Sequence, residues 1–157
     1  MTTEPSGRRR AGPPGAVVSL VAASALALGA WWLVDRARES RLDAQLAGFR
    51  GAQLPAAGAP VDGTLAGLGA ELFRRRCSAC HAITGESRVG PDLAGVTERR
   101  TLPWIEAMIL RPDSMTRDDP DARALREAYP VQMLVTGEMD PARARAVIEF
   151  LRQVDRR

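Results

Sequence analysis

Two cysteines and the only histidine of this chain lie within five consecutive residues. Cys77, Cys80 and His81 form the sequence C-x-x-C-H in a chain of 157 residues. A structural zinc site needs four ligands, usually Cys or His, and only three are present. A thioredoxin-like redox pair is expected in a βαβ setting, and no convincing strand pattern surrounds these residues. A disulfide in an oxidising compartment stays open as an alternative, although a bridge across two residues would constrain little of the chain.

The spacing C-x-x-C-H is the attachment signature of a c-type haem. Two thiols three positions apart can each bond a vinyl-derived carbon of one porphyrin. The adjacent imidazole then lies beneath the ring with a nitrogen directed at the iron. The sequence therefore predicts one covalently bound haem c on Cys77 and Cys80, with His81 as the proximal axial ligand.

Residues 16–34, AVVSLVAASALALGAWWLV, are uncharged and almost wholly apolar. A stretch of this length can cross a bilayer core of about 30 Å as a helix. Arginines 8–10 precede it, and Trp31 and Trp32 lie near its far end, where indoles favour the membrane interface. We therefore expect a transmembrane anchor over residues 16–34. The preceding segment, residues 1–15, is expected in the cytoplasm if the chain after the span is exported.

A cleaved signal peptide is the alternative to an anchor. Residues 25–27, Ala-Leu-Ala, have the small-x-small pattern of a cleavage site. The apolar character continues for seven residues beyond that site, which favours the uncleaved anchor. Three arginines precede the span and three closely follow it, so the distribution of positive charge does not set the orientation.

The formal net charge of +3 is unevenly distributed. Residues 1–61 carry seven arginines and four acidic residues, whereas residues 62–157 carry fifteen of each. Lysine is absent, and no arginine stripe is interleaved with aromatic residues, as a surface that binds nucleic-acid strands would need. The composition therefore gives no support to a nucleic-acid partner.

Two regions follow the apolar stretch. Residues 35–61 are expected to form a stalk and a flexible linker. Leu42, Leu46 and Phe49 recur at helical spacing, and the next residues, GAQLPAAGAPVDG, are rich in Ala, Gly and Pro without a period. Residues 62–157 are expected to form the haem domain.

Helical patterns flank the haem motif. Leu65, Leu68, Leu72 and Phe73 repeat at helical spacing and end at the cysteine-containing turn. Near the other end of the chain, residues 140–141, Asp-Pro, are typical of a helix start, with Asp as N-cap and Pro in the first turn. That second helix then carries one apolar face, made by Val147, Phe150, Leu151 and Val154.

The stretch GAELFRRRCSACHAITGESRVGPDLAGV resembles the haem-binding core of small monohaem class I cytochromes c. Residues 69–73 match their G-x-x-L-F, and residues 90–93 match their G-P-x-L. The resemblance covers residues 64–154 and is weak over 97–128. It implies an all-α class I cytochrome c fold around one covalently attached haem, preceded here by a single N-terminal transmembrane helix.

The resemblance also assigns roles to residues outside the haem motif. The carbonyl of Pro91 is expected to accept a hydrogen bond from the free ring N–H of His81, which would orient the imidazole and raise its basicity. The alternative for Pro91 is a simple turn. Phe150 is expected to pack over Gly69 and so to close the two ends of the domain around the haem.

The chain has no second histidine, so a sixth ligand supplied by the protein is expected to be a methionine, which raises the reduction potential relative to histidine. Similar cytochromes place this ligand in a loop several residues before the last helix, which selects Met133. Their usual Met-Pro reads here as Met133-Leu134, a departure from the pattern. Met139 directly precedes the predicted cap Asp140 and is expected in the core.

Three further methionines and an open iron complete the alternatives. Met108 lies in an expected helix after Pro103 and is assigned to the core. Met115 lies in a polar segment expected to be rich in turns, and Met1 precedes the apolar span. An iron left open or bound to water is the remaining possibility.

The expected function is single-electron transfer by a cytochrome c that is not itself an enzyme. The resemblance implies haem attachment outside the cytoplasm, so we expect a single-pass protein of the cytoplasmic membrane with its haem domain on the periplasmic face. Expected partners are a quinol-oxidising complex, a terminal oxidase or a periplasmic reductase. The alternatives are a haem subunit of a larger membrane oxidoreductase and a haem protein whose open iron binds small ligands.

Overall fold

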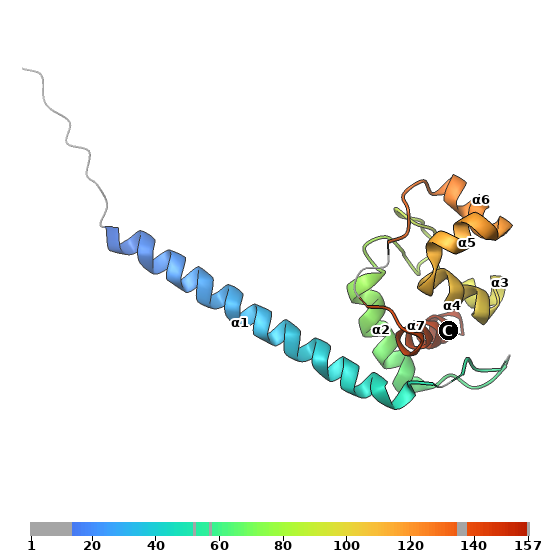
Figure 1. The fold of residues 1–157 in the computed structure, drawn as a ribbon, viewed down its shortest axis with the longest axis horizontal. Coiled ribbons are helices and arrows are strands. Elements are labelled where there is room, and N and C mark those ends of the chain that lie inside the picture. Colours follow the sequence, from blue (N-terminus) through green and yellow to red (C-terminus); the bar gives the residue numbers. More distant parts are fainter. Residues whose placement is uncertain (1–13, 52, 57, 135–137, 157) are drawn as a thin grey trace, which may run out of the picture. The chain divides into compact units, whose positions relative to one another are not determined.

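The structure is a computed structural model that describes residues 14–51, 53–56, 58–134 and 138–156. Within these ranges the chain forms helices and loops and no strand, which confirms the predicted all-α class (Figure 1). The chain divides into two compact units, residues 1–41 and 42–157. The helices are α1 (Pro14–Leu46), the 3-10 helix η1 (Ala47–Phe49), α2 (Gly63–Arg76), α3 (Val96–Arg99), α4 (Leu102–Leu110), α5 (Pro112–Asp118), α6 (Pro120–Ala128) and α7 (Pro141–Asp155).

Helix α1 contains the predicted apolar span. By length and composition it is the one helix among the described residues that could cross a membrane, although a signal sequence would have the same properties. The described large apolar side chains of this span are exposed, with Leu26 at 76% and Trp31 at 67%. Of the expected cytoplasmic segment, residues 1–13 lie outside the described part of the chain.

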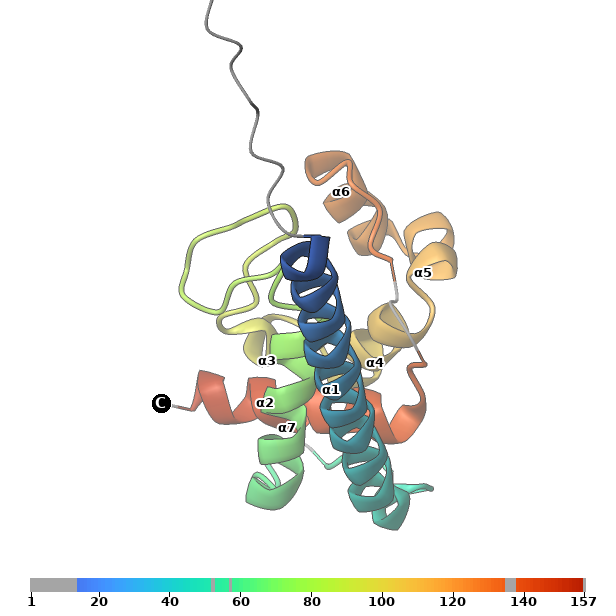
Figure 2. The ribbon, with the colours of Figure 1, turned by 90° about the vertical axis from the view of Figure 1, so that its left-hand side faces the viewer.

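The predicted haem domain is organised by the crossing of α2 and α7 (Figures 1 and 2). A Cβ atom placed on Gly69 would lie 1.8 Å from the carbonyl oxygen of Ala146 and 3.0 Å from Cβ of Phe150. Only glycine lets the two backbones approach this closely. The rings of Phe73 and Phe150 meet beside the crossing at a centroid distance of 5.3 Å. The expected packing of Phe150 over Gly69 is confirmed.

The remaining helices of the domain pack against α7 or against one another. Helices α3 and α4 pack against it, α5 follows α4, and α5 and α6 lie side by side. The apolar centre lies between α2, α4 and α7, where Leu65, Leu72 and Ile148 are fully buried. This arrangement leaves α4 facing the segment that follows α2.

Helix α7 begins where the sequence predicts. The side chain of Asp140 accepts a hydrogen bond from the backbone N–H of Arg143, and Pro141 occupies the first turn. Arg143, which is 7% exposed, also contacts the carboxylate of Asp43. The α1 segment beside Asp43 adds Leu42 and Leu46 to the core, at 5% and 3% exposure. The compact unit therefore starts at residue 42 rather than at the predicted 62.

A second ion pair attaches the predicted linker to α7. Glu149 and Arg152 are 1% and 4% exposed, and their charged groups lie 2.7 Å apart. Glu149 also accepts a hydrogen bond of 3.2 Å from the N–H of Asp62, while Arg152 donates to the carbonyl of Ala59. The end of segment 35–61 is thus hydrogen-bonded to the domain, in contrast to the free tether that its composition predicts.

After α4, the region of weak resemblance continues with two short helices, α5 and α6. Prolines at the first turns of α5 and α6 start each helix, and the side chain of Asp119 caps α6 by accepting from the N–H of Ala122. Met115 lies on α5, so its assignment to a turn-rich segment was wrong. Proline is favoured both in turns and at the first turn of a helix, which explains the error.

We predict that Gly69→Ala destabilises the haem domain by about 1–3 kcal/mol, because the added methyl would overlap a backbone atom of α7 and force the helices apart. Gly67→Ala is the matched control: it lies on the same helix, is exposed and has no neighbour within 4 Å. The control should be stabilised by up to about 1 kcal/mol through helix propensity. Denaturant unfolding of the haem-loaded protein measures both. Equal stabilities for the two variants would contradict the close crossing.

Candidate functional site: a haem-binding cavity

The C-x-x-C-H segment forms a tight turn directly after α2. Cys77 is the C-cap of α2, and its carbonyl accepts hydrogen bonds from the N–H groups of Cys80 at 3.1 Å and His81 at 2.9 Å. The two cysteines do not form a disulfide with each other. Burial raises the pKa of the Cys77 thiol to about 11, so this side chain is neutral at pH 7. The turn thus brings both thiols and the imidazole to the wall of one cavity.

Pro91 and Gly90 position the imidazole of His81. The Nδ1 atom of His81 lies 2.9 Å from the carbonyl oxygen of Pro91. Because a carbonyl only accepts, Nδ1 carries the proton and Nε2 retains its lone pair. A Cβ atom on residue 90 would lie 2.7 Å from Cε1 of the same ring. Gly90 therefore lets the backbone lie against the imidazole, a role that the sequence pattern alone did not reveal.

The loop between His81 and α3 is held in place by side-chain hydrogen bonds. The carboxylate of Asp92 accepts from the N–H groups of Thr84 at 3.1 Å and Ala94 at 2.8 Å. The hydroxyl groups of Ser87 and Tyr129 lie 2.9 Å apart and connect this loop to the end of α6. These bonds hold Pro91 in position to meet His81.

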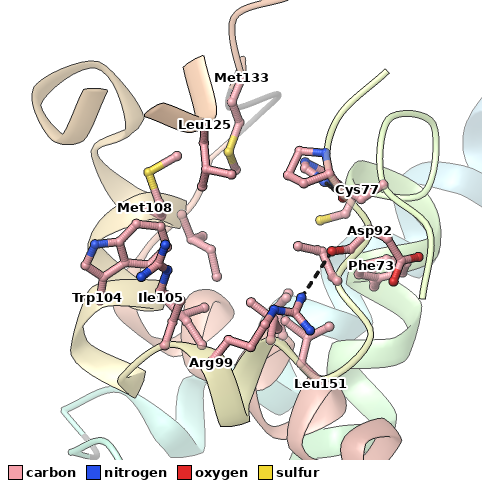
Figure 3. A pocket seen from close by; sticks show the side chains of 17 residues that line it. Phe73, Cys77, Asp92, Arg99, Trp104, Ile105, Met108, Leu125, Met133 and Leu151 are labelled. Atoms are coloured by element: carbon pink, nitrogen blue, oxygen red, sulfur yellow. Dashed lines mark hydrogen bonds between the residues drawn. The ribbon is translucent and has the colours of Figure 1, made fainter. Parts of the chain in front are cut away.

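Two adjoining cavities, of about 350 and 400 Å³, lie between this loop and α4, and Figure 3 shows the first of them. The first is lined mainly by apolar side chains of α2, α4 and α7. The second extends toward Cys80 and the segment before residue 135. Six residues line both cavities and so mark the region where they meet: Cys77, His81, Pro91, Met108, Leu125 and Met133.

The methionines divide into two groups. Met133 lines both cavities, on the side opposite Cys77 (Figure 3). Met108 lines both as well, whereas the sequence assigned it to the core. Met115 and Met139 are half-buried and line neither cavity. Met1 lies outside the described residues.

The sequence also indicates which face of α4 lines the cavity, although the sequence analysis did not use this pattern. Trp104, Ile105, Met108 and Ile109 recur at positions that share one face of a helix, and all four line the first cavity. Such an apolar face indicates burial, but the spacing alone does not show whether the face packs against protein or against a cofactor.

Two arginines give the first cavity positive charge. Arg99 donates to the carbonyls of Ala94 and Asp92 (Figure 3). Arg100 stacks over the ring of Trp104 at 4.9 Å and pairs with the Asp121 carboxylate at 2.6 Å. Both guanidinium groups lie in a wall that is otherwise largely apolar.

These residues fit a covalently attached haem. The cavity is apolar and large enough for a cofactor. It has two cysteine thiols at one wall, an imidazole with an oriented lone pair and a thioether on the opposite side. The arginines are suited to the two carboxylates that a haem carries.

We predict that Gly90→Ala displaces the His81 ring, because a methyl group at 2.7 Å from Cε1 cannot be accommodated without movement. The haem should remain attached through the cysteines, but the ligation by His81 should weaken. The absorption spectrum should then show a high-spin fraction that the wild type lacks. Gly63→Ala, at an open position with no neighbour within 4 Å, is the control and should leave the spectrum unchanged. A low-spin spectrum for both variants would contradict the role assigned to Gly90.

Comparison with known proteins identifies the family. The cytochrome c family model matches residues 66–155. Cytochrome c from Rhodothermus marinus is 33% identical, with a TM-score of 0.61 over 72% of this chain and 96% of that chain. An engineered cytochrome c from the same organism, bound to a carbene intermediate, is 31% identical, with a TM-score of 0.60 over 74% and 99%. No curated protein matches the chain. The chain therefore belongs to the cytochrome c family and carries covalently attached haem c, the cofactor of haem-based electron transfer.

Proposed function

We propose that this protein is a membrane-tethered electron carrier with a His/Met-ligated haem. Cys77 and Cys80 form the thioether bonds, His81 is the proximal ligand and Met133 the distal one. The observation that carries the proposal is the oriented imidazole. The bond from Nδ1 to the Pro91 carbonyl leaves Nε2 as the ring's donor atom, and the thioether of Met133 lies across the cavity.

The bound haem supplies the redox couple, in which the iron alternates between the ferrous and ferric states. The chain sets the conditions for that couple. The hydrogen bond from His81 to Pro91 fixes the ring and raises its basicity as a ligand. A thioether on the other side favours the ferrous state and a higher potential. The apolar walls from α2, α4 and α7 exclude water, so little reorganisation accompanies the change of charge.

Membrane attachment is the second part of the proposal. Residues 16–34 anchor the protein in the cytoplasmic membrane, and the haem domain lies on the periplasmic face, where c-type haem is attached in similar proteins. The exposed apolar side chains of α1 support the anchor, because lipid would cover them. A tether raises the local concentration of the carrier near membrane partners. Suitable partners are a quinol-oxidising complex, a terminal oxidase or a periplasmic reductase.

The ligand assignment predicts one methionine methyl group shifted far upfield by the haem ring current in the ferrous protein. Full-length protein labelled with methyl-¹³C methionine in detergent should show this signal alongside a reversible one-electron titration. The signal should persist in Met139→Leu and in Met115→Leu, since neither residue lines the cavity and Met-to-Leu exchanges are well tolerated. Its loss in either variant would transfer the assignment to that residue. Its absence from the wild type would favour an open iron.

The proposed topology predicts that protease added to spheroplasts reaches the haem domain and that the mature protein sediments with membranes. Trypsin should cut after Arg50, which lies in an exposed turn between η1 and the segment hydrogen-bonded to α7. Haem-stained fragments report the cleavage. Protection in intact spheroplasts, with cleavage only after lysis, would place the domain on the other face. An N-terminus that begins after residue 27 would identify a cleaved signal peptide.

A further inference from the structure

Helix α4 places a second thioether at the haem site. We infer that Met108 is a reserve distal ligand, which coordinates the iron when the bond to Met133 is open or missing. The inference rests on the proposed ligation by His81. To that ligation the inference adds a second protein sulfur, which keeps the iron six-coordinate.

The first argument is the place of Met108 in the cavity. The six residues that line both cavities surround the region where the cavities meet. A haem bonded to Cys77 and held by His81 would occupy that region, because both residues line it. His81 lies on one side of it, and Met108 and Met133 both belong to it. Figure 3 shows both methionines across the cavity from Cys77, with Leu125 between them in this view. Met108 thus belongs to the central region, as Met133 does.

The second argument is the difference between the two backbones. Met108 lies within α4, whose N-terminus is capped by Thr101 and whose Ile105 is buried at 5% exposure in the core. Its backbone is therefore fixed, and only its side chain can move. Met133 follows Pro130 in a segment without helix, between an exposed Val131 at 61% and an exposed Leu134 at 74%. The segment that holds Met133 is less constrained by packing than the helix that holds Met108.

The third argument is the chemistry of the side chain. A thioether is neutral and polarizable, and three rotatable bonds let methionine adapt to irregular space. Met108 is half-buried and needs no change of charge to coordinate. In the exchange one iron–sulfur bond breaks and another forms, and neither a proton nor an electron is transferred. Water or a small diatomic ligand could also occupy an open distal position on the iron, and either would then compete with the sulfur of Met108.

The test compares four haem-loaded, full-length proteins: wild type, Met108→Leu, Met133→Ala and the double variant. The first readout is the weak thioether-to-iron band at the red end of the ferric spectrum. The second is the rate of carbon monoxide binding to the ferrous protein. Helicity and covalent haem staining confirm that each variant is folded and loaded. Met133→Val repeats the measurement with a larger side chain if Met133→Ala loads poorly.

We expect the band in wild type, in Met108→Leu and in Met133→Ala, and its loss only in the double variant. Carbon monoxide should bind to Met133→Ala at least roughly tenfold more slowly than to the double variant, because Met108 must first leave the iron. If Met133→Ala and Met133→Val both match the double variant, Met108 does not ligate and the inference fails while His/Met ligation in the wild type stands. If Met108→Leu alone abolishes the band, Met108 is the resident ligand, which overturns both its reserve role and the assignment of Met133.

Discussion

The close contact between α2 and α7 at Gly69 sets the geometry of the haem domain. Because the carbonyl of Ala146 occupies the space where a side chain of residue 69 would lie, the two helices meet backbone to backbone. This crossing brings the start and the end of the domain together. It also fixes Phe73 and Cys77, at the end of α2, relative to Val147 and Leu151 on α7, and all four line the first cavity. The cavity is thus a consequence of the crossing.

Helix α7 also joins the domain to the chain that precedes it. Two ion networks, one at Arg143 and one at the buried pair Glu149 and Arg152, bind Asp43, the N–H of Asp62 and the carbonyl of Ala59. Buried charges are weak evidence for added stability, because their desolvation is costly. Losing one member of the Glu149–Arg152 pair, however, would leave the other buried without its ionic partner, at a cost of about 3–5 kcal/mol. These networks therefore favour one specific path for residues 42–62 across the domain. The segment that leads into the haem domain is therefore held in a defined position on that domain.

The haem site combines rigid and adaptable parts. On the proximal side, Gly90 and Pro91 hold His81 from two directions, through a steric contact and a hydrogen bond. On the other side, the wall is made of Leu125 and two methionines, which have no directional bond to hold them. The imidazole is thus held by a directional bond, whereas the opposite wall consists of side chains that can change rotamer.

The sequence by itself determined the features that depend on local spacing. These are the C-x-x-C-H turn, the apolar span of α1, the capped start of α7 at Asp140 and the need for glycine at residue 69. Such features were predictable because their causes lie within a few residues of one another. The tertiary structure alone decided which long-range partners meet. Met115 was misassigned because a proline-rich segment is typical of turns as well as of helix starts, and the cavity position of Met108 was not foreseen because a helical stripe does not reveal what lies across from it. The attachment of residues 42–62 to α7 likewise depends on charges up to 100 positions apart in the chain, and only folding brings these together.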